Sequence, residues 1–399
     1  MAEIKDIISP SNPRENFNFR SFLEFYQLTQ PTGAPQRGLT DNLYGINHQN
    51  VKNFLPESRD SVGLTFFTRP QLNMGDLNLR NERMLYNLLT TESKSVYRYV
   101  RMMLDPRLGT GNNKLSCPLI DNQLAFIPVL TNNLISVSGW PDITLDVHNS
   151  KSGVRREVHS MVDSPIDIYY DFDINCTFKN VKEDPLFALF ITWGIYMSRV
   201  FDGAMSPYLD FITENELDYN TRIYRLILDE SRTYVKKIAA TGASFPVNVP
   251  VGKFFDYNDS TPYSEQNKTI DITFKCNGAN YMDPVLIYEF NKTVGIFNPD
   301  MREENRSTRE IINRILDRAP FGMSGRDVRN INSYGSTPSS NMVKIPISLI
   351  DKFNFRGYPR IDPDTSELEW WVNKNSAYYT KVMRTLINDD FKQALQGNQ

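Results

Sequence analysis

The chain has few of the residues that hold metals or disulfide bonds. Only three cysteines and three histidines occur among its 399 residues. The cysteines are odd in number and far apart, which excludes a disulfide framework and the close spacing of a zinc site. The histidines also lack metal-ligand spacing, so the sequence predicts no metal, no cofactor and no catalytic residue. These residues are Cys117, Cys176, Cys276, His48, His148 and His159.

Long runs of one character are missing as well. The most apolar stretch, residues 186–197, is shorter than the roughly 20 residues that cross a bilayer. The first residues have neither the basic start nor the apolar core of a signal peptide. The 44 basic and 47 acidic residues give a net charge of −3, whereas a dedicated binder of DNA or anionic membranes needs a basic surplus. We therefore expect a protein folded in a cytoplasm, without membrane insertion.

The most informative stretch of the chain is the strict alternation at residues 166–178. Its apolar parity consists of Ile166, Ile168, Tyr170, Phe172, Ile174, Cys176 and Phe178. Its polar parity consists of Asp167, Tyr169, Asp171, Asp173, Asn175 and Thr177. This pattern predicts one long strand with a buried face and a wet, acidic face. It exceeds the usual strand length of about five or six residues and suits a barrel or ring whose strands share a wall.

Three aspartates on the polar parity, Asp167, Asp171 and Asp173, are the candidate functional residues. Asp171 and Asp173 have the spacing of an Asp-x-Asp metal-binding pair, but this pattern is frequent by chance. Asp167 and Asn175 continue the same face, which indicates a solvated strand face with no focal metal site. If the strand lines a channel, these carboxylates repel DNA phosphates and let a genome pass without sticking.

The N-terminal part of the chain divides into two predicted regions. Residues 1–60 are polar, contain several prolines and carry five aromatic residues within a short stretch. They predict an extended arm with one short helix near residues 19–28, of the kind that gains order on a neighbouring subunit. Residues 61–160 predict a mixed α/β addition with a strand at 62–70 and a helix at 81–104.

The segment 161–299 predicts a β domain with one packed helix. Asp184 as N-cap and Pro185 as first residue predict a helix that ends near Gly203. Residues 221–229 predict a strand, and residues 233–240 fit either its return strand or a helix. A break is predicted at residues 242–246, followed by strands at 268–276, 285–290 and 294–297. Cys176 and Cys276 fall on the apolar parity of their strands and are expected in the core.

The C-terminal part predicts two further regions. Residues 300–341 form a helix, which opens at Asn298-Pro299 and runs to about residue 317, and a flexible linker. Residues 342–399 form a β-hairpin, with strands near 343–350 and 367–372, and a closing helix at 377–393. Trp370 and Trp371 are expected to face opposite ways, so that one packs inward and the other reaches an interface.

The order of these elements over residues 166–299 resembles the tail-tube fold of contractile-tail bacteriophages. The matching features are the long strand, the helix with Trp193, the strand ending in Ile227-Leu228-Asp229, the Gly-Ala-x-x-Pro element at Gly242 and the strand Ile270-Asp-Ile-Thr-Phe274. They cover about a third of the chain, and their order and spacing carry the resemblance. The resemblance implies a virion component that stacks as six-fold rings around a DNA channel. Tube subunits of this family tend to be shorter, so the long flanking segments fit a specialised ring better than the repeating tube protein. Such rings are tube initiators, baseplate caps and tail-terminating or neck proteins.

The sequence thus predicts an α+β protein: an antiparallel β-barrel or sandwich domain with a packed helix, plus mixed additions at both ends. The expected function is structural, as a ring in a phage tail, baseplate or neck. Expected partners are further copies in a hexameric ring, other tail proteins and passing genomic DNA. The expected location is the virion, assembled in the host cytoplasm. Two alternatives remain: a carbohydrate-active or cell-wall-degrading phage enzyme, which needs converging carboxylates, and a nucleic-acid-binding module, which needs a basic aromatic groove.

Overall fold

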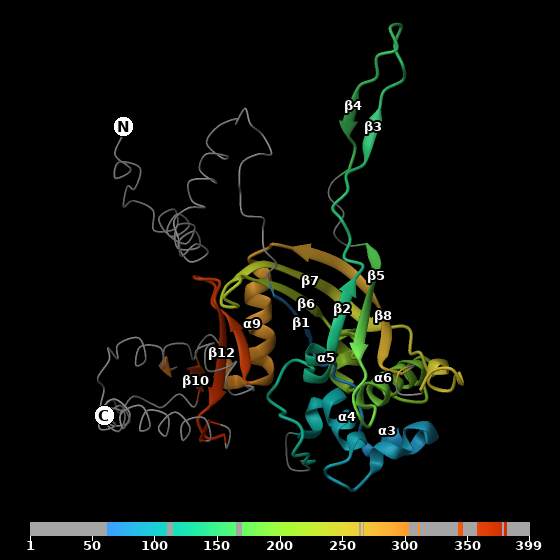
Figure 1. Ribbon diagram of the computed structural model, residues 1–399, viewed down its shortest axis with the longest axis vertical. Helices are drawn as coiled ribbons and strands as arrows, with labels where there is room; N and C mark the ends of the chain where they lie inside the picture. Colours follow the sequence, from blue (N-terminus) through green and yellow to red (C-terminus); the bar gives the residue numbers. More distant parts are fainter. Residues whose placement is uncertain are drawn as a thin grey trace.

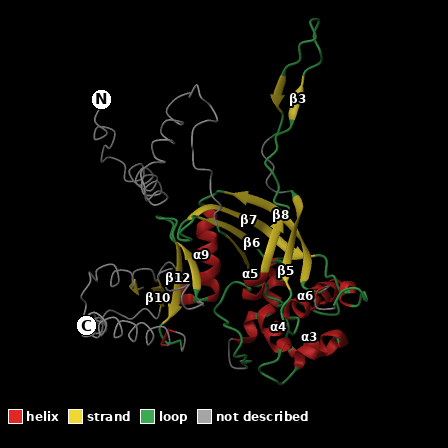
Figure 2. Cartoon of the chain, in the orientation of Figure 1, coloured by secondary structure: helices red, strands yellow, loops and turns green. Residues whose placement is uncertain are grey.

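The main body of the protein is a curved β-sheet with helices on both sides, from which one long hairpin projects (Figure 1). The computed structural model describes residues 62–109, 115–164, 170–262, 265, 267–302, 310–311, 342–345, 357–376 and 379–380. The predicted arm and its helix at 19–28, the linker and the closing helix at 377–393 lie almost wholly outside these residues. The fold is α+β, as predicted (Figure 2).

The central sheet has six strands, all antiparallel, in the order β1-β6-β7-β8-β5-β2. These strands are β1 (Gly63–Phe67), β2 (Leu134–Ser138), β5 (Asp171–Lys179), β6 (Ile223–Leu228), β7 (Val235–Pro246) and β8 (Thr269–Tyr281). The helices are α3 (Asp76–Asn81), α4 (Val96–Leu104), α5 (Pro128–Asn133), α6 (Pro185–Phe201), α7 (Leu209–Glu214) and α9 (Val285–Phe297). The strands β1 and β2 come from the predicted region 61–160, and they pair into the same sheet as β5 to β8 from the predicted region 161–299. The division of the chain into domains stays a prediction.

The sheet is nearly closed into a barrel. The segment before α5 pairs with the end of β1, through a bridge between Thr68 and Phe126 and a bond from Ile127 N to Phe67 O of 2.9 Å. From there α5 leads directly into β2, the strand at the opposite edge. The barrel is not fully closed, because β2 pairs with β5 alone among the described strands.

The long alternating strand is confirmed over its described part. In β5 the residues alternate between exposed and buried from Asp171 to Phe178. Residues 165–169 are outside the described chain. The partner strand β8 alternates in the same way, and Cys176 and Cys276 lie in the core as predicted. The third cysteine, Cys117, is also buried.

The buried parity of β5 and β8 packs against α6 and α4 to form the first core. Phe190 of α6 lies 5.8 Å from Phe178 and 6.0 Å from Phe274, measured between ring centroids. Trp193 is fully buried and donates a 3.1 Å hydrogen bond to the carbonyl of Tyr219. Each such buried aromatic contributes about 2–3 kcal/mol of hydrophobic stabilisation. The helix containing Trp193 therefore holds one face of the sheet, as predicted.

The start of α6 departs from the prediction in one detail. Pro185 is its first residue, as expected, but Asp184 adopts a left-handed conformation with φ 49° and makes no capping hydrogen bond. Its carboxylate accepts instead from the Asn180 side chain at 2.7 Å. The Asp184 side chain therefore stabilises the turn between β5 and α6 and does not cap the helix.

A second core lies on the other side of β1, β6 and β7, under α9. The ring of Phe290 packs on Phe66, Phe126 and Tyr224 at centroid distances of 5.4, 5.0 and 5.3 Å. The prediction of strands at 285–290 and 294–297 is wrong, since α9 is one helix. Its buried residues Leu286, Phe290 and Val294 recur every four positions, the helical spacing, although its aliphatic composition resembles that of a strand.

The predicted helix at 81–104 is also wrong as a single element. It consists of the end of α3, a 3-10 helix (Arg83–Leu89) and α4. Glu82 adopts an extended conformation and caps the 3-10 helix through Met84 N, and Ser95 caps α4 through Tyr97 N. These polar residues compete with the helical backbone for hydrogen bonds, so the segment folds as separate short helices.

Of the two possibilities for residues 233–240, the return strand is correct: β7 runs from Val235 to Pro246. The predicted break at Gly242 is wrong, because β7 continues through it and pairs with both β6 and β8. The glycine is needed for a close approach: a Cβ at Gly242 would lie 2.6 Å from the backbone oxygen of Asn277. Gly278 beside it has φ +71°. The glycine pair bends the sheet without ending its strands.

A hairpin that the sequence reading missed joins β2 to β5. It contains the short strands β3 (Val147–Asn149) and β4 (Ser160–Val162) and stands clear of the main body (Figure 1). His148 and His159 lie on its two arms. Trp140 anchors its base, at 6.5 Å from Phe172 and 6.1 Å from Tyr281.

The C-terminal sheet is larger than the predicted hairpin. It has the order β11-β12-β10-β9 and comprises β9 (Glu310–Ile311), β10 (Met342–Ile345), β11 (Tyr358–Ile361) and β12 (Leu368–Asn373). The helix predicted to reach residue 317 is wrong: a 3-10 helix ends at Met301, Arg302 is extended, and residues 310–311 form β9. Trp371 is buried and Trp370 is half-buried, so the two rings differ in environment as predicted.

Candidate functional site

The sequence-predicted site residues lie on the uncovered face of the central sheet. The side chains of Asp171 and Asp173 are 67% and 53% exposed, on the parity of β5 that faces away from the first core. Asp167 lies outside the described residues. The structure therefore brings Asp171 and Asp173 together on one solvated surface.

This surface is polar across both β5 and β8, and we call it the polar face. It consists of Asp171, Asp173, Asn175, Thr177 and Lys179 on β5 and of Thr269, Asp271, Thr273, Lys275 and Asn277 on β8. Side chains that face each other across the two strands form hydrogen bonds. Thr273 Oγ1 donates to Asn175 Oδ1 and Thr177 Oγ1 donates to Asp271 Oδ1, each at 2.8 Å. The polar face is therefore an ordered network of side chains.

Lys275 is the central cation of the polar face. Its Nζ lies 2.8 Å from Asp171 Oδ2 and 3.2 Å from Asp173 Oδ1. The hydrogen bond from Lys275 lowers the pKa of Asp171, and the bonds to both aspartates raise the pKa of Lys275. Asp171 and Lys275 are thus both charged at neutral pH, and the ammonium group is engaged by carboxylates on two sides.

The charge of the polar face is smaller than the sequence suggests. Its three aspartates are offset by Lys179 and Lys275, which leaves one negative charge in excess. Lys253 also approaches from a neighbouring loop, with its Nζ 3.6 Å from Asp271 Oδ2. Sequence reasoning missed Lys253 and Lys275 because they come from segments distant from β5 in the chain. The face therefore offers paired charges and hydrogen-bonding groups to whatever lies opposite.

Two features make this half of the sheet available for contact. The side opposite the first core is covered by α9 at β1, β6 and β7, whereas β5 and β8 present exposed polar residues on that side. The adjoining strand β2 is the edge of the sheet and exposes Ile135, which is 58% accessible. An edge strand presents unpaired backbone groups that can pair with another chain.

The projecting hairpin is a second exposed surface. Its apolar residues are largely accessible to solvent, namely Ile143, Leu145, Val147, Val154, Val158, Met161 and Val162. An isolated two-stranded hairpin is marginally stable in water, and exposed apolar residues at this density mark an interaction surface. The alternation of Ile143, Leu145 and Val147 with polar residues was the signal in the sequence that could have revealed it.

The described residues contain no group of three or more His, Cys, Asp or Glu that could hold a metal ion. Two of the three buried aspartates in the described residues, Asp105 and Asp218, accept hydrogen bonds from Tyr208 and Tyr196. Asp105 is fully inaccessible and also accepts from the backbone of Met74 at 2.9 Å. These carboxyls link segments of the fold. Among the described helices none has the length and apolar character needed to cross a bilayer.

The sheet has an exposed edge at β2, and the half of its second face that α9 leaves uncovered is polar and ordered. Together with the projecting hairpin, these exposed surfaces are typical of a subunit that assembles with other chains. The class is thus a structural protein with a tail-tube-like α+β fold. Comparison with known families confirms the resemblance seen in the sequence: the family described as "Putative phage tail tube protein" matches residues 8–388. The chain belongs to this family and is a structural protein of a phage tail.

Three solved structures of contractile systems are similar to part of the chain. They are the anti-feeding prophage cap, described as a tube-terminating cap (14% identity, TM-score 0.24), the PVC sheath/tube terminator in the extended state (13%, 0.23) and the PVC sheath-tube complex in the extended state (13%, 0.22). Each match covers 40% of this chain and 82%, 88% and 82% of the other chain, respectively. Such low scores carry no argument about function. No curated protein sequence matches the chain.

Proposed function

We propose that the protein forms a hexameric ring around the DNA channel of a phage tail, as part of the tube, the baseplate or the neck. In this proposal the polar face lines the channel, with Asp171 and Asp173 described on it and Asp167 continuing the same parity. The ring binds other tail proteins and is a component of the virion. The subunit acts by shape and assembly and has no catalytic residues.

The observation that carries the proposal is the composition of the uncovered half of the sheet. A wall along DNA must be wet, ordered and free of cations that would hold phosphates. The centre of the polar face has these properties, because Lys275 is engaged by Asp171 and Asp173, Thr273 bonds to Asn175, and Thr177 bonds to Asp271. Lys253 beside Asp271 offsets the one excess negative charge, so the face as a whole offers phosphates no net attraction.

The edges of the sheet support assembly into a ring. β2 exposes one edge, and lateral pairing with a neighbouring copy would satisfy its backbone groups. Copies related by rotation contact each other through different surfaces on each side, and such contacts close into rings. Continuous pairing around a ring would remove the exposed edges.

The enzymatic and nucleic-acid-binding alternatives make different demands. Hydrolysis of a glycosidic bond needs two carboxylates that face each other across a cleft. Asp171 and Asp173 instead lie side by side on one strand and share Lys275. Binding of single-stranded nucleic acid needs a basic groove with stacking aromatics, and the polar face has no basic excess.

Size-exclusion chromatography with mass determination, followed by negative-stain imaging of the purified full chain, tests the proposal. We expect rings with a central opening, alone or after addition of the other tail proteins of the same phage. A chain that stays monomeric at high concentration and in the presence of those proteins would contradict it. Release of fragments from purified cell walls would favour the enzyme instead.

A further inference from the structure

The tip of the hairpin is a small basic surface, which we call the basic tip. It is formed by Lys151, Val154, Arg155 and Arg156, all exposed. Glu157 offsets one of the three cations, since its carboxylate accepts from Arg155 N at 2.8 Å, which leaves two positive charges in excess. The turn is well defined: Gly153 N donates to Glu157 O and Arg156 N donates to Gly153 O, each at 2.9 Å. Val154 is completely exposed, at 102%. The structure thus holds two arginines and an apolar side chain at the far end of a narrow ribbon.

A second exposed loop, between β7 and β8, has the opposite character, and we call it the acidic loop. It carries Phe255, Asp256, Tyr257 and Asp259, all exposed. Phe255 and Tyr257 are each 81% accessible, and the Tyr257 hydroxyl lies 3.1 Å from Asp259 Oδ1. Lys253, near the start of this loop, donates to Thr269 O at 2.9 Å and lies 3.6 Å from Asp271, so it does not offset the carboxylates of the acidic loop.

We propose that the basic tip of one copy binds the acidic loop of a second copy of this chain. The two surfaces complement each other in charge and in type of contact. Arginine pairs with carboxylates through bidentate hydrogen bonds and stacks on aromatic rings. Val154, Phe255 and Tyr257 are exposed and would add buried apolar area to this interface. Arg and Tyr are also enriched among the residues that contribute most to binding energy at interfaces.

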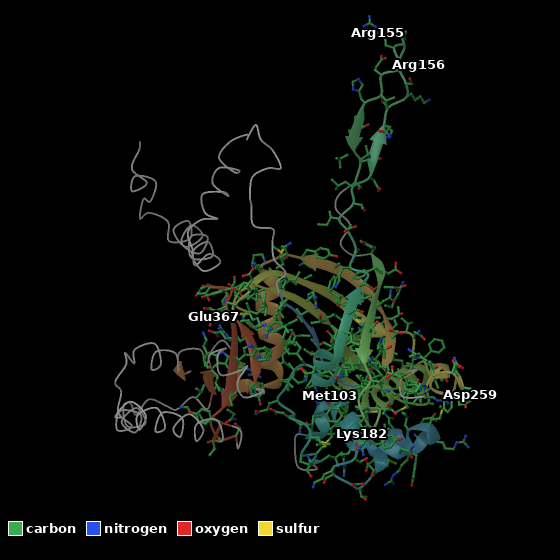
Figure 3. All side chains as sticks on the ribbon, viewed as in Figure 1. Met103, Arg155, Arg156, Lys182, Asp259 and Glu367 are labelled. Atoms are coloured by element: carbon green, nitrogen blue, oxygen red, sulfur yellow. The ribbon has the colours of Figure 1, made fainter. Side chains whose placement is uncertain are left out.

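The positions of the two surfaces require that the contact be between copies. Arg155 and Arg156 lie at the end of the projecting hairpin, whereas Asp259 lies at the right-hand edge of the main body, well away from the tip (Figure 3). The two cannot meet within one subunit. A contact between different surfaces of identical copies is head-to-tail, and repeated contacts of this kind build a ring or a stack. The inference rests on the proposed function and names the surfaces through which the copies join.

Charge reversal of each surface tests the pairing in the full chain. The first variant carries Arg155→Glu and Arg156→Glu, and the second carries Asp256→Lys and Asp259→Lys. Each variant alone presents two surfaces of the same sign to its neighbours, so we expect the assembled fraction in sedimentation to fall at least tenfold. An equimolar mixture of the two restores complementary pairs at every contact, so we expect it to assemble as the wild type does.

The control carries the same change of charge at two exposed lysines elsewhere, Lys94→Glu and Lys182→Glu, and should assemble normally. Thermal melting of each variant should match the wild type, because all four substituted tip and loop residues are exposed.

Normal assembly of either single variant, or failure of the mixture to assemble, would overturn the pairing while leaving the proposed ring in place. Loss of DNA binding by the arginine variant with assembly unchanged would assign the basic tip to nucleic acid and overturn it too. If even the wild type does not assemble, the proposed function itself fails.

Discussion

At the scale of single residues, neighbours in β5 experience opposite environments. Phe172 is 8% exposed and packs near Trp140 and Tyr170, whereas the adjacent Asp171 side chain lies in solvent beside Lys275. We expect Phe172→Asp to lower the free energy of unfolding by about 3 kcal/mol or more, because it leaves a charge in the core without a partner. Asp171→Ala should barely change the melting temperature. Urea denaturation of both variants measures the contrast, and severe unfolding of Asp171→Ala would show that the faces are reversed.

Two buried aspartates make stability depend on pH. Burial raises the pKa of Asp105 and of Asp218, so the folded protein holds these protons more tightly than the unfolded chain. The resulting stabilisation is complete below the ordinary aspartate pKa of about 4 and is lost as the pH rises through the raised values. We expect Asp105→Asn to flatten this part of the curve of unfolding free energy against pH.

Asp76 is the control for this measurement, since its hydrogen bond with Arg101 lowers its pKa. Its stabilisation is present above the ordinary pKa and is lost as the pH falls through the lowered value. Asp76→Asn should therefore change only the acidic end of the curve. An unchanged slope in Asp105→Asn would contradict the role assigned to Asp105.

At the scale of elements, the path of β7 depends on one glycine. A Cβ at Gly242 would meet the backbone oxygen of Asn277 at 2.6 Å, and a backbone atom cannot swing aside as a side chain does. We expect Gly242→Ala to cost about 1–3 kcal/mol, the usual range for overpacking. Gly252→Ala, where nothing lies within 4 Å, should stay within about 0.5 kcal/mol of the wild type. Chemical denaturation compares the two, and equal stabilities would refute the close approach.

One side chain of α9 pairs with the backbone of the C-terminal sheet as a neighbouring strand would, in addition to the apolar contacts between them. Asn291 Nδ2 donates to Ile361 O at 2.7 Å, and Ile361 N donates to Asn291 Oδ1 at 2.9 Å. Asn291→Leu leaves both buried backbone groups unpaired, which should cost about 2 kcal/mol. Hydrogen exchange over residues 357–376 should become faster in this variant. The exposed neighbour Lys292→Ala should exchange as the wild type, and protection retained in Asn291→Leu would mean that β11 is held in another way.

At the scale of the whole molecule, the polar face and the assembled particle can be tested together. Replacing Asp167, Asp171 and Asp173 with lysine frees Lys275 and adds three cations, while the buried parity of β5 is unchanged. We expect particles to assemble but to eject their genome more slowly, because free ammonium groups hold phosphates. Ejection from assembled particles is the measurement. A control with lysine at three exposed glutamates on other elements should eject normally: Glu214, Glu216 and Glu230. Normal ejection by the aspartate variant would remove the channel role and leave the fold as described.

Sequence reasoning succeeded where a local pattern and the tertiary environment agree. The alternation at β5 and β8 and the apolar helix with Trp193 were recognised, because each of these elements meets one continuous core with one face. It failed at α9, whose aliphatic residues were interpreted as strands, and at residues 81–104, where Glu82 and Ser95 divide the helix. The exposure of Asp171 and Asp173 could be predicted from the alternation of the strand. Their ion pairs with Lys275 could not, because they depend on the pairing of β5 with β8.

The sequence by itself determined the α+β class, the two faces of β5 and the resemblance to tail-tube proteins, because period-two alternation and element order are properties of the chain alone. The tertiary structure decided which strands pair, and hence that β1 and β2 join the central sheet. It also decided that α9 covers β1, β6 and β7 on the side opposite the first core and leaves the polar face of β5 and β8 exposed. It also decided that the hairpin stands free with its arginines at the tip. These features depend on contacts between residues far apart in the chain, and local patterns carry no information about such partners.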